Sequence, residues 1–83
     1  MQKVFSIFDS KSMLFSQPFF SPTKGSAIRA FEQAVNDPKT DFNKYPNDFT
    51  LFEIGDWHED KGIIEPTQTP INIGLAIEFK KEI

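Results

Sequence analysis

The chain has 83 residues and no cysteine, which limits it to a single small domain (residues 1–83) without disulfides or thiolate metal sites. A chain of this length buries only roughly 60–65% of its unfolded surface, so its ten Phe, one Trp and one Tyr, or a homodimer, must supply the missing stability. The net charge of −3 argues against a protein that binds polyanions by overall charge and restricts any DNA contact to a local patch.

The first 22 residues predict one strand and an aromatic loop. Residues 2–8 are rich in β-forming side chains and predict a short strand, which the turn formers of residues 9–12 end. Residues 13–22 combine large apolar side chains with Pro18 and Pro22. They predict an irregular loop that covers an edge of the core, with at most a short extended piece.

One amphipathic helix of about twelve residues follows this loop. Apolar side chains recur there with the period of one helical face, at Ala27, Ile28, Phe31, Ala34 and Val35. Ser21 or Thr23 is expected to cap its start. Asn36-Asp37-Pro38 is expected to end it, because proline cannot continue the ladder of helical hydrogen bonds.

The second half of the chain predicts three strands after a polar loop. Residues 37–48 form the loop, which Phe42 and Tyr45 are expected to anchor. Residues 49–57 predict a strand, 59–62 a hairpin turn, and 63–65 a return strand that stops before Pro66. Residues 71–79 alternate between apolar and small or polar side chains and predict the last strand.

The resulting order of strand, helix, strand, strand and strand predicts an α+β fold. One amphipathic helix packs on a mostly antiparallel sheet of about four strands. The expected core combines the helix stripe with Phe5, Ile7, Leu51 or Phe52, Ile54, and the odd-numbered positions from 71 to 79. The small residues Gly74 and Ala76 then form a flat opposite face, which is either solvated or accepts a second subunit.

The sequence offers no catalytic or cofactor-binding motif. His58 is the only histidine, and Asp56, Glu59 and Asp60 around it lack a recognised metal-ligand spacing. A nucleophile elbow and a phosphate-binding loop are also missing. We therefore expect neither an enzyme nor a metal or cofactor site. Because no apolar run approaches a membrane span of about 20 residues, we expect no membrane partner either.

A nucleic-acid surface is the remaining candidate. The free N–H groups at a helix start favour phosphate oxygens, Lys24 and Arg29 lie at the start and on the outer face of the predicted helix, and nearby aromatic rings can stack on bases. The candidate contacts are Lys11, Lys24, Arg29, Lys44, Tyr45, Phe19 and Phe20. The alternative is that both phenylalanines belong to the core and the cations only solubilise the protein, and the residues alone favour this alternative.

Four segments together resemble one known family, the small non-structural proteins of gokushoviruses (single-stranded DNA phages of the Microviridae). They are residues 18–31 (PFFSPTKGSAIRAF), 34–38 (AVNDP), 45–55 (YPNDFTLFEIG) and 75–80 (LAIEFK). The resemblance implies a phage protein made in the cytoplasm of the bacterial host and absent from the capsid shell. It also implies DNA binding during genome replication or packaging, without assigning residues to that role.

Two hypotheses follow. In the first, a non-enzymatic and dimeric accessory protein contacts single-stranded DNA through the candidate residues. In the second, an adaptor docks on the phage replication initiator or on the capsid protein without touching DNA. A small protein that modulates the host is a third reading, whose target the sequence does not indicate.

Overall fold

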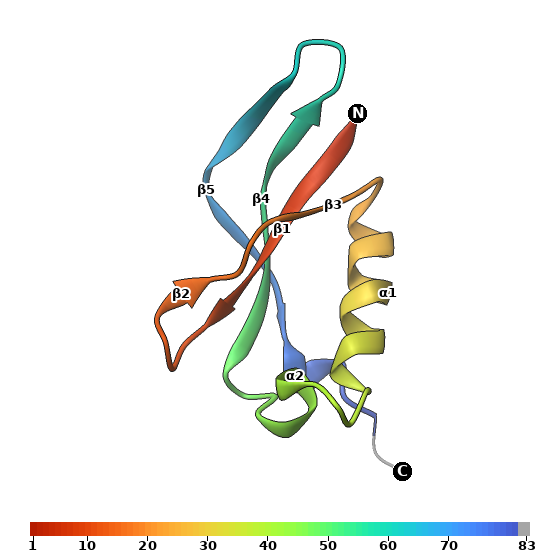
Figure 1. The fold of residues 1–83 in the computed structure, drawn as a ribbon, viewed down its shortest axis with the longest axis vertical. Helices are drawn as coiled ribbons and strands as arrows, with labels where there is room; N and C mark the ends of the chain where they lie inside the picture. The colour runs from red at the N-terminus through yellow and green to blue at the C-terminus, as the bar shows by residue number, and fades with distance from the viewer. Residues whose placement is uncertain (82–83) are drawn as a thin grey trace.

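The computed structural model describes residues 1–81 and places one long helix beside a curled antiparallel sheet (Figure 1). The elements are β1 (Gln2–Asp9), β2 (Leu14–Phe15), β3 (Phe19–Ser21), α1 (Lys24–Val35), α2 (Asp41–Lys44), β4 (Phe49–His58), β5 (Ile63–Leu75) and the 3-10 helix η1 (Ala76–Glu78). The molecule is elongated, 44 × 24 × 18 Å, because the β4–β5 hairpin extends beyond the helices. The α+β class and the antiparallel sheet are confirmed.

The sheet is built around β1, and the predicted order of elements is wrong in its first part. The strand order is β2-β1-β4-β5, and β3 also pairs with β1. β2 pairs with the end of β1, at Phe8 and Asp9, whereas β3 pairs with its beginning, at residues 3–5. The segment predicted as an irregular loop therefore supplies two short strands before the helix.

Helix α1 follows the prediction closely. Thr23 caps its start: the Thr23 Oγ1 accepts from the Ser26 amide at 3.1 Å, and the Thr23 amide donates to the Ser26 Oγ at 3.2 Å. The helix ends at Asn36, whose side-chain amide donates to the carbonyl of Glu32 at 2.8 Å and to that of Phe79 at 3.0 Å. Its end is thus tied to the C-terminal segment.

We expect Thr23→Ala to lower the free energy of unfolding by about 1 kcal/mol, because a lost N-cap leaves helical amides without a partner. For a domain of this size that corresponds to a fall in melting temperature of about 4–8 °C. Thermal unfolding followed by circular dichroism measures it. Thr69→Ala, at an exposed position of β5, is the control and should leave the melting temperature within about 2 °C.

The core lies between α1 and one face of the sheet. Its buried members are Phe5, Ala27, Phe31, Val35, Leu51 and Ala76. Of the two alternatives in β4, Leu51 is the core residue, and it pairs with Ile7 of β1. Because side chains alternate along a strand, Phe52 points to the other face. Ile54, also predicted for the core, is half-buried and lies outside this cluster.

The two predicted C-terminal strands are one continuous strand, β5. Pro66 does not end it, because β5 is an edge strand that pairs only with β4, and an edge tolerates residues that cannot donate. The pairing is irregular: Gly55 faces Pro66 and Glu53 faces Ile71, so residues 67–70 bulge out opposite a single residue of β4.

The predicted alternation over residues 71–79 is confirmed only in part: Ile73 and Phe79 pack against the core as predicted, whereas Ile71 and Ile77 do not. A register shift between Leu51 and Phe52 exchanges the faces of β5, and the chain then turns into η1. Ile71 and Ile77, expected in the core, are 47% and 42% exposed. Gly74 and Ala76 are buried, so the flat face predicted for a second subunit does not exist. The homodimer remains a prediction, but the surface that the sequence suggested for its interface is not available.

The polar loop before β4 contains the short helix α2. Its Phe42 ring packs edge-to-face against Phe31 and Phe49, with centroids 5.8 and 4.9 Å away, so this predicted anchor is confirmed. Tyr45 is 58% exposed and does not anchor the loop.

Candidate binding surfaces

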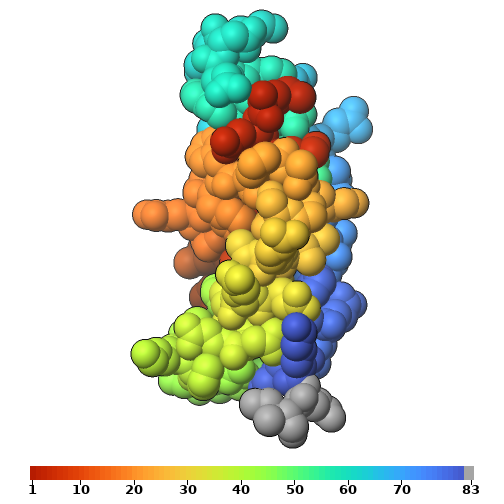
Figure 2. Space-filling view, turned by 90° about the vertical axis from the view of Figure 1, so that its right-hand side faces the viewer, coloured from red at the N-terminus to blue at the C-terminus, as the bar shows by residue number. Residues whose placement is uncertain are grey.

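Lys24 and Arg29 lie on the outer face of α1, which Figure 2 shows from the helix side. Both are exposed, and neither forms an ion pair within residues 1–81. Lys24 is the first residue of the helix, beside the Thr23 cap. These two cations are therefore available to a partner, as the helical period predicts.

Lys11 and Tyr45 are brought together by the contact between two loops. The Ser10 amide in the β1–β2 turn donates to the Asp48 carbonyl at 2.9 Å. Lys11 and Tyr45 consequently line one cavity of about 350 Å³, whose other lining residues are Asp9, Asp41, Asp48 and Phe49. Three aspartates and one lysine line it, so the cavity carries a net negative charge, and we call it the acidic cavity.

The three candidate lysines and the one candidate arginine do not form one patch. Lys44 lies in α2, beyond the C-terminal end of α1, whereas Lys24 begins that helix (Figure 1). Twelve helical residues at about 1.5 Å each separate the two positions by about 18 Å. A single strand of DNA contacting Lys24 and Arg29 therefore follows a different path from one contacting Lys44.

Phe19 and Phe20 point to opposite faces of the sheet. Phe19 is half-buried and stacks on the core residue Phe5, with ring centroids 5.7 Å apart. Phe20 is 45% exposed, and its ring packs edge-to-face with that of Trp57, with the two centroids 5.9 Å apart. Only Phe20 thus has an accessible ring, on the face that α1 does not cover.

This uncovered side of the sheet, which we call the far face, carries more aromatic rings. Phe8, Phe15 and Phe52 form a cluster with centroids 4.8–6.5 Å apart, and Phe15 is 46% exposed. Neither Phe15 nor Trp57 was predicted as a site residue. The sequence does contain a signal for this second apolar face: Ile7 and Phe8 are adjacent in a predicted strand, so their side chains point to opposite faces of the sheet and both faces need to be covered.

Lys3 lies close to acidic side chains that compensate its charge. Its Nζ is 3.3 Å from the Glu53 Oε2 and 3.6 Å from the Asp56 Oδ1. The hydrogen bond and charge of Glu53, followed by the charge of Asp56, raise the pKa of Lys3 above its ordinary 10.5. Lys3 therefore stays charged at neutral pH and is engaged within the protein. His58 is similarly engaged, with Nε2 2.9 Å from the Glu65 Oε1.

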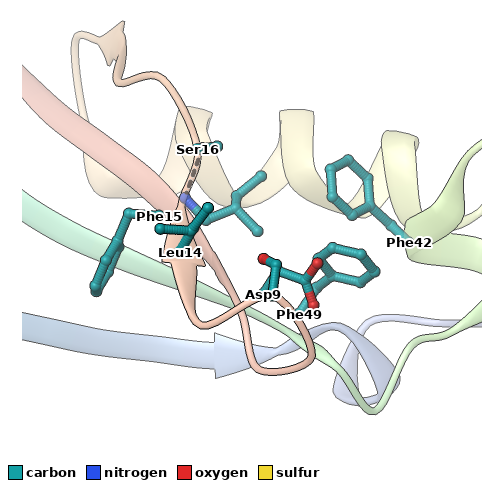
Figure 3. Close-up of a pocket in the computed structure, with 8 residues that line it drawn as sticks. Asp9, Leu14, Phe15, Ser16, Phe42 and Phe49 are labelled. Atoms are coloured by element: carbon teal, nitrogen blue, oxygen red, sulfur yellow. Dashed lines mark hydrogen bonds between the residues drawn. The ribbon is translucent and has the colours of Figure 1, made fainter.

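A second cavity of about 290 Å³ adjoins the acidic one through the shared residues Asp9 and Phe49. Its apolar lining comes from β1, β2, α2 and β4 and includes Ile7, Leu14, Phe15, Phe42 and Phe49. Figure 3 shows Asp9 between Leu14 and the ring of Phe49, with Phe42 extending from α2. We call the two adjoining cavities together the β1–α2 groove.

Comparisons with known proteins match nearly the whole chain. The profile of the family described as phage ORF5 protein matches residues 2–79. Protein ORF5 of Chlamydia phage 1 is 35% identical over 89 aligned residues, covering 94% of this chain and 93% of that protein. No solved structure matches. Within the described residues, no helix has the length and hydropathy needed to cross a membrane.

Proposed function

Because the chain belongs to the phage ORF5 protein family, we propose that it acts in the host cytoplasm as a non-enzymatic accessory protein of phage genome replication or packaging that binds single-stranded DNA. The family and the relative from Chlamydia phage 1, a gokushovirus, confirm the resemblance drawn from the sequence. A phage accessory protein is the part of this statement that the comparisons support directly. The proposal of DNA binding rests instead on the exposed side chains of the protein.

The exposed ring of Phe20 beside the start of α1 carries the DNA proposal. Phe20 lies on β3, an edge strand, and Lys24 at the start of α1 follows it by four residues. Bases that stack on Phe20 and Trp57 would let the sugar-phosphate backbone pass the edge of the sheet to Lys24 and continue along α1 to Arg29. Stacking on aromatic rings tolerates any base, as packaging of a whole genome requires.

The other candidate residues contribute less to this arrangement. Lys11 and Tyr45 line the acidic cavity, where carboxylates repel phosphate. Phe19 is half-buried and stacks on the core residue Phe5, so its ring is less accessible to a base than that of Phe20. The proposed contact therefore centres on Phe20, with Lys24 and Arg29 as the phosphate ligands.

We expect a fluorescein-labelled thymidine 20-mer to bind the wild type at low salt. Phe20→Ala should weaken binding about 5- to 150-fold, because one stacked base is worth about 1–3 kcal/mol. The Lys24→Ala/Arg29→Ala double variant should weaken it and reduce the slope of log K against log salt by about 1.4, the value for two phosphates on a single strand. Fluorescence anisotropy measures both.

Lys39→Ala/Lys61→Ala is the matched control, since it removes the same charge from exposed positions elsewhere. It should keep the wild-type salt slope. Absence of binding at low salt, or unchanged binding by the Lys24→Ala/Arg29→Ala variant, would reject this DNA site.

An adaptor without DNA contact is the second candidate, and the β1–β2 turn favours it. Met13 and Leu14 are 69% and 67% exposed there, in a protein whose net charge of −3 opposes binding to phosphates. In this role the protein docks on the phage replication initiator or on the capsid protein. Pull-down experiments with each purified protein, in the absence of DNA, distinguish the two candidates.

A further inference from the structure

We propose that the β1–α2 groove binds an extended segment of a partner protein that presents one aliphatic or aromatic side chain and, close to it, one Lys or Arg. This inference deepens the adaptor candidate by giving the chemistry of the partner. It does not depend on DNA binding, because the groove lies at the end of β1, around Asp9, whereas Phe20 pairs with its beginning, opposite Val4.

The apolar cavity of the groove is suited to a single large side chain. Its volume of about 290 Å³ lies at the lower end of the range of about 300–1,000 Å³ for ligand pockets, too small for a large cofactor. The rings of Phe42 and Phe49 meet edge-to-face at 4.9 Å and 88°, which fixes the floor of the cavity before any partner binds. Leu14 stands at its border with two thirds of its surface exposed.

The acidic cavity of the groove selects the charge of the partner. Asp9, Asp41 and Asp48 line it against the single ammonium group of Lys11. Among residues 1–81, the ion pairs involve other carboxylates, so these three aspartates have no cationic partner within 4 Å, although the Asp9 Oδ1 accepts a hydrogen bond from the Lys11 amide at 2.9 Å. Tyr45 and Phe49 add ring faces on which an ammonium or guanidinium group can rest. Charge complementarity therefore favours a cationic side chain next to the apolar one.

The backbone around the groove favours an extended partner. Within residues 1–81, β2 pairs with β1 alone, so the outer edge of its two residues is open to the backbone of an incoming strand. Met13, just before β2, has a φ of 62°, in the left-handed region that residues other than glycine rarely adopt. Backbone strain of this kind persists mainly where a loop has a function, and Met13 directly precedes Leu14, which lines the groove.

The test is a titration of the isotope-labelled protein with two short probe peptides, followed by two-dimensional NMR. The first is acetyl-Gly-Leu-Ser-Arg-Gly-amide, and the second replaces its Arg with Glu. We expect the Arg peptide to shift the amide signals of Asp9, Tyr45 and Phe49 in a saturable way. The Glu peptide should bind at least about 10-fold more weakly, because like charges oppose it in the acidic cavity. Equal binding of both peptides, or no saturable shift, would overturn the proposal.

Variants inside and outside the groove test whether the peptide binds there. Asp48→Asn should weaken binding of the Arg peptide about 3- to 10-fold, whereas Asp60→Asn, at an exposed position in the β4–β5 turn, should not change it. Leu14→Ser should weaken both peptides. The thymidine 20-mer should leave the three amide signals in place; if it shifts them, the groove is a DNA site and the proposal is wrong. If neither peptide binds, the DNA-binding measurement with Phe20→Ala is unaffected, so each proposal can be rejected without rejecting the other.

Discussion

Phe31→Ala should remove a large part of the stability of the protein. Phe31 is 2% exposed and lies in the middle of α1, where its ring contacts Phe42 and Phe79 edge-to-face at 5.8 and 5.7 Å. Truncating a buried phenylalanine costs about 3–5 kcal/mol, and a domain of this length has a total stability of about 4–12 kcal/mol. We therefore expect a fall of about 3–5 kcal/mol in the free energy of unfolding, measured by urea denaturation followed by circular dichroism.

Phe20→Ala is the matched control for this loss. It makes the same chemical change at a ring that is 45% exposed and contacts Trp57 alone among the aromatic residues. It should cost about 1 kcal/mol, the worth of one aromatic pair. Equal losses in the two variants would show that Phe31 is not the side chain that joins α1 to α2 and the C-terminal segment. A small loss at Phe20 also shows that its DNA test reports binding and not unfolding.

The helix was predictable because its signals are local. The Thr23 cap, the apolar stripe and the stop before Pro38 each act within a few residues, and α1 begins and ends where they indicate. The same holds for Lys24 and Arg29, since the helical period alone places them on the outer face. These parts of the fold and of the candidate site needed no knowledge of distant residues.

The strands were less predictable because their partners decide them. β2 and β3 have two and three residues, too few for a periodic signal, and they exist by pairing with β1. By local rules Pro66 predicts the end of a strand. It nevertheless lies within β5, because a strand at the edge of the sheet tolerates a residue without a backbone N–H. One register shift near Leu51 then reverses which side chains of β5 point inward, and no local pattern reports such a shift.

The β1–α2 groove was not predictable for the same reason. Lys11 and Tyr45 are distant in sequence, and only the hydrogen bond between the Ser10 amide and the Asp48 carbonyl brings their loops together. The sequence predicts Lys11 as a phosphate contact and Tyr45 as a ring that stacks on a base, each from its own chemistry. Their surroundings, three carboxylates from three different segments, give the site the opposite preference in charge.

Gly55→Ala is the substitution we expect to disturb β5 most. Gly55 is buried in β4 opposite Pro66, and a Cβ built there would lie 2.7 Å from the carbonyl oxygen of Glu65. That atom belongs to the backbone of β5, so the strand itself must move to make room. Overpacking of this kind costs about 1–3 kcal/mol, which urea denaturation measures. The amide signals of Glu65 and Ile64 should shift in the same variant.

Gly25→Ala is the matched control, and it should change stability in the opposite direction. Its Cβ would meet only the Thr23 Oγ1, at an ordinary contact distance of 3.9 Å, in the first turn of α1. Alanine restricts the unfolded chain more than glycine does, so we expect a gain of about 0.4–1 kcal/mol. If Gly55→Ala were as stable as the wild type, the edge strand would be able to shift without loss. The bulge at residues 67–70 would then be the place where β5 absorbs the movement, because those residues have no fixed partner in β4.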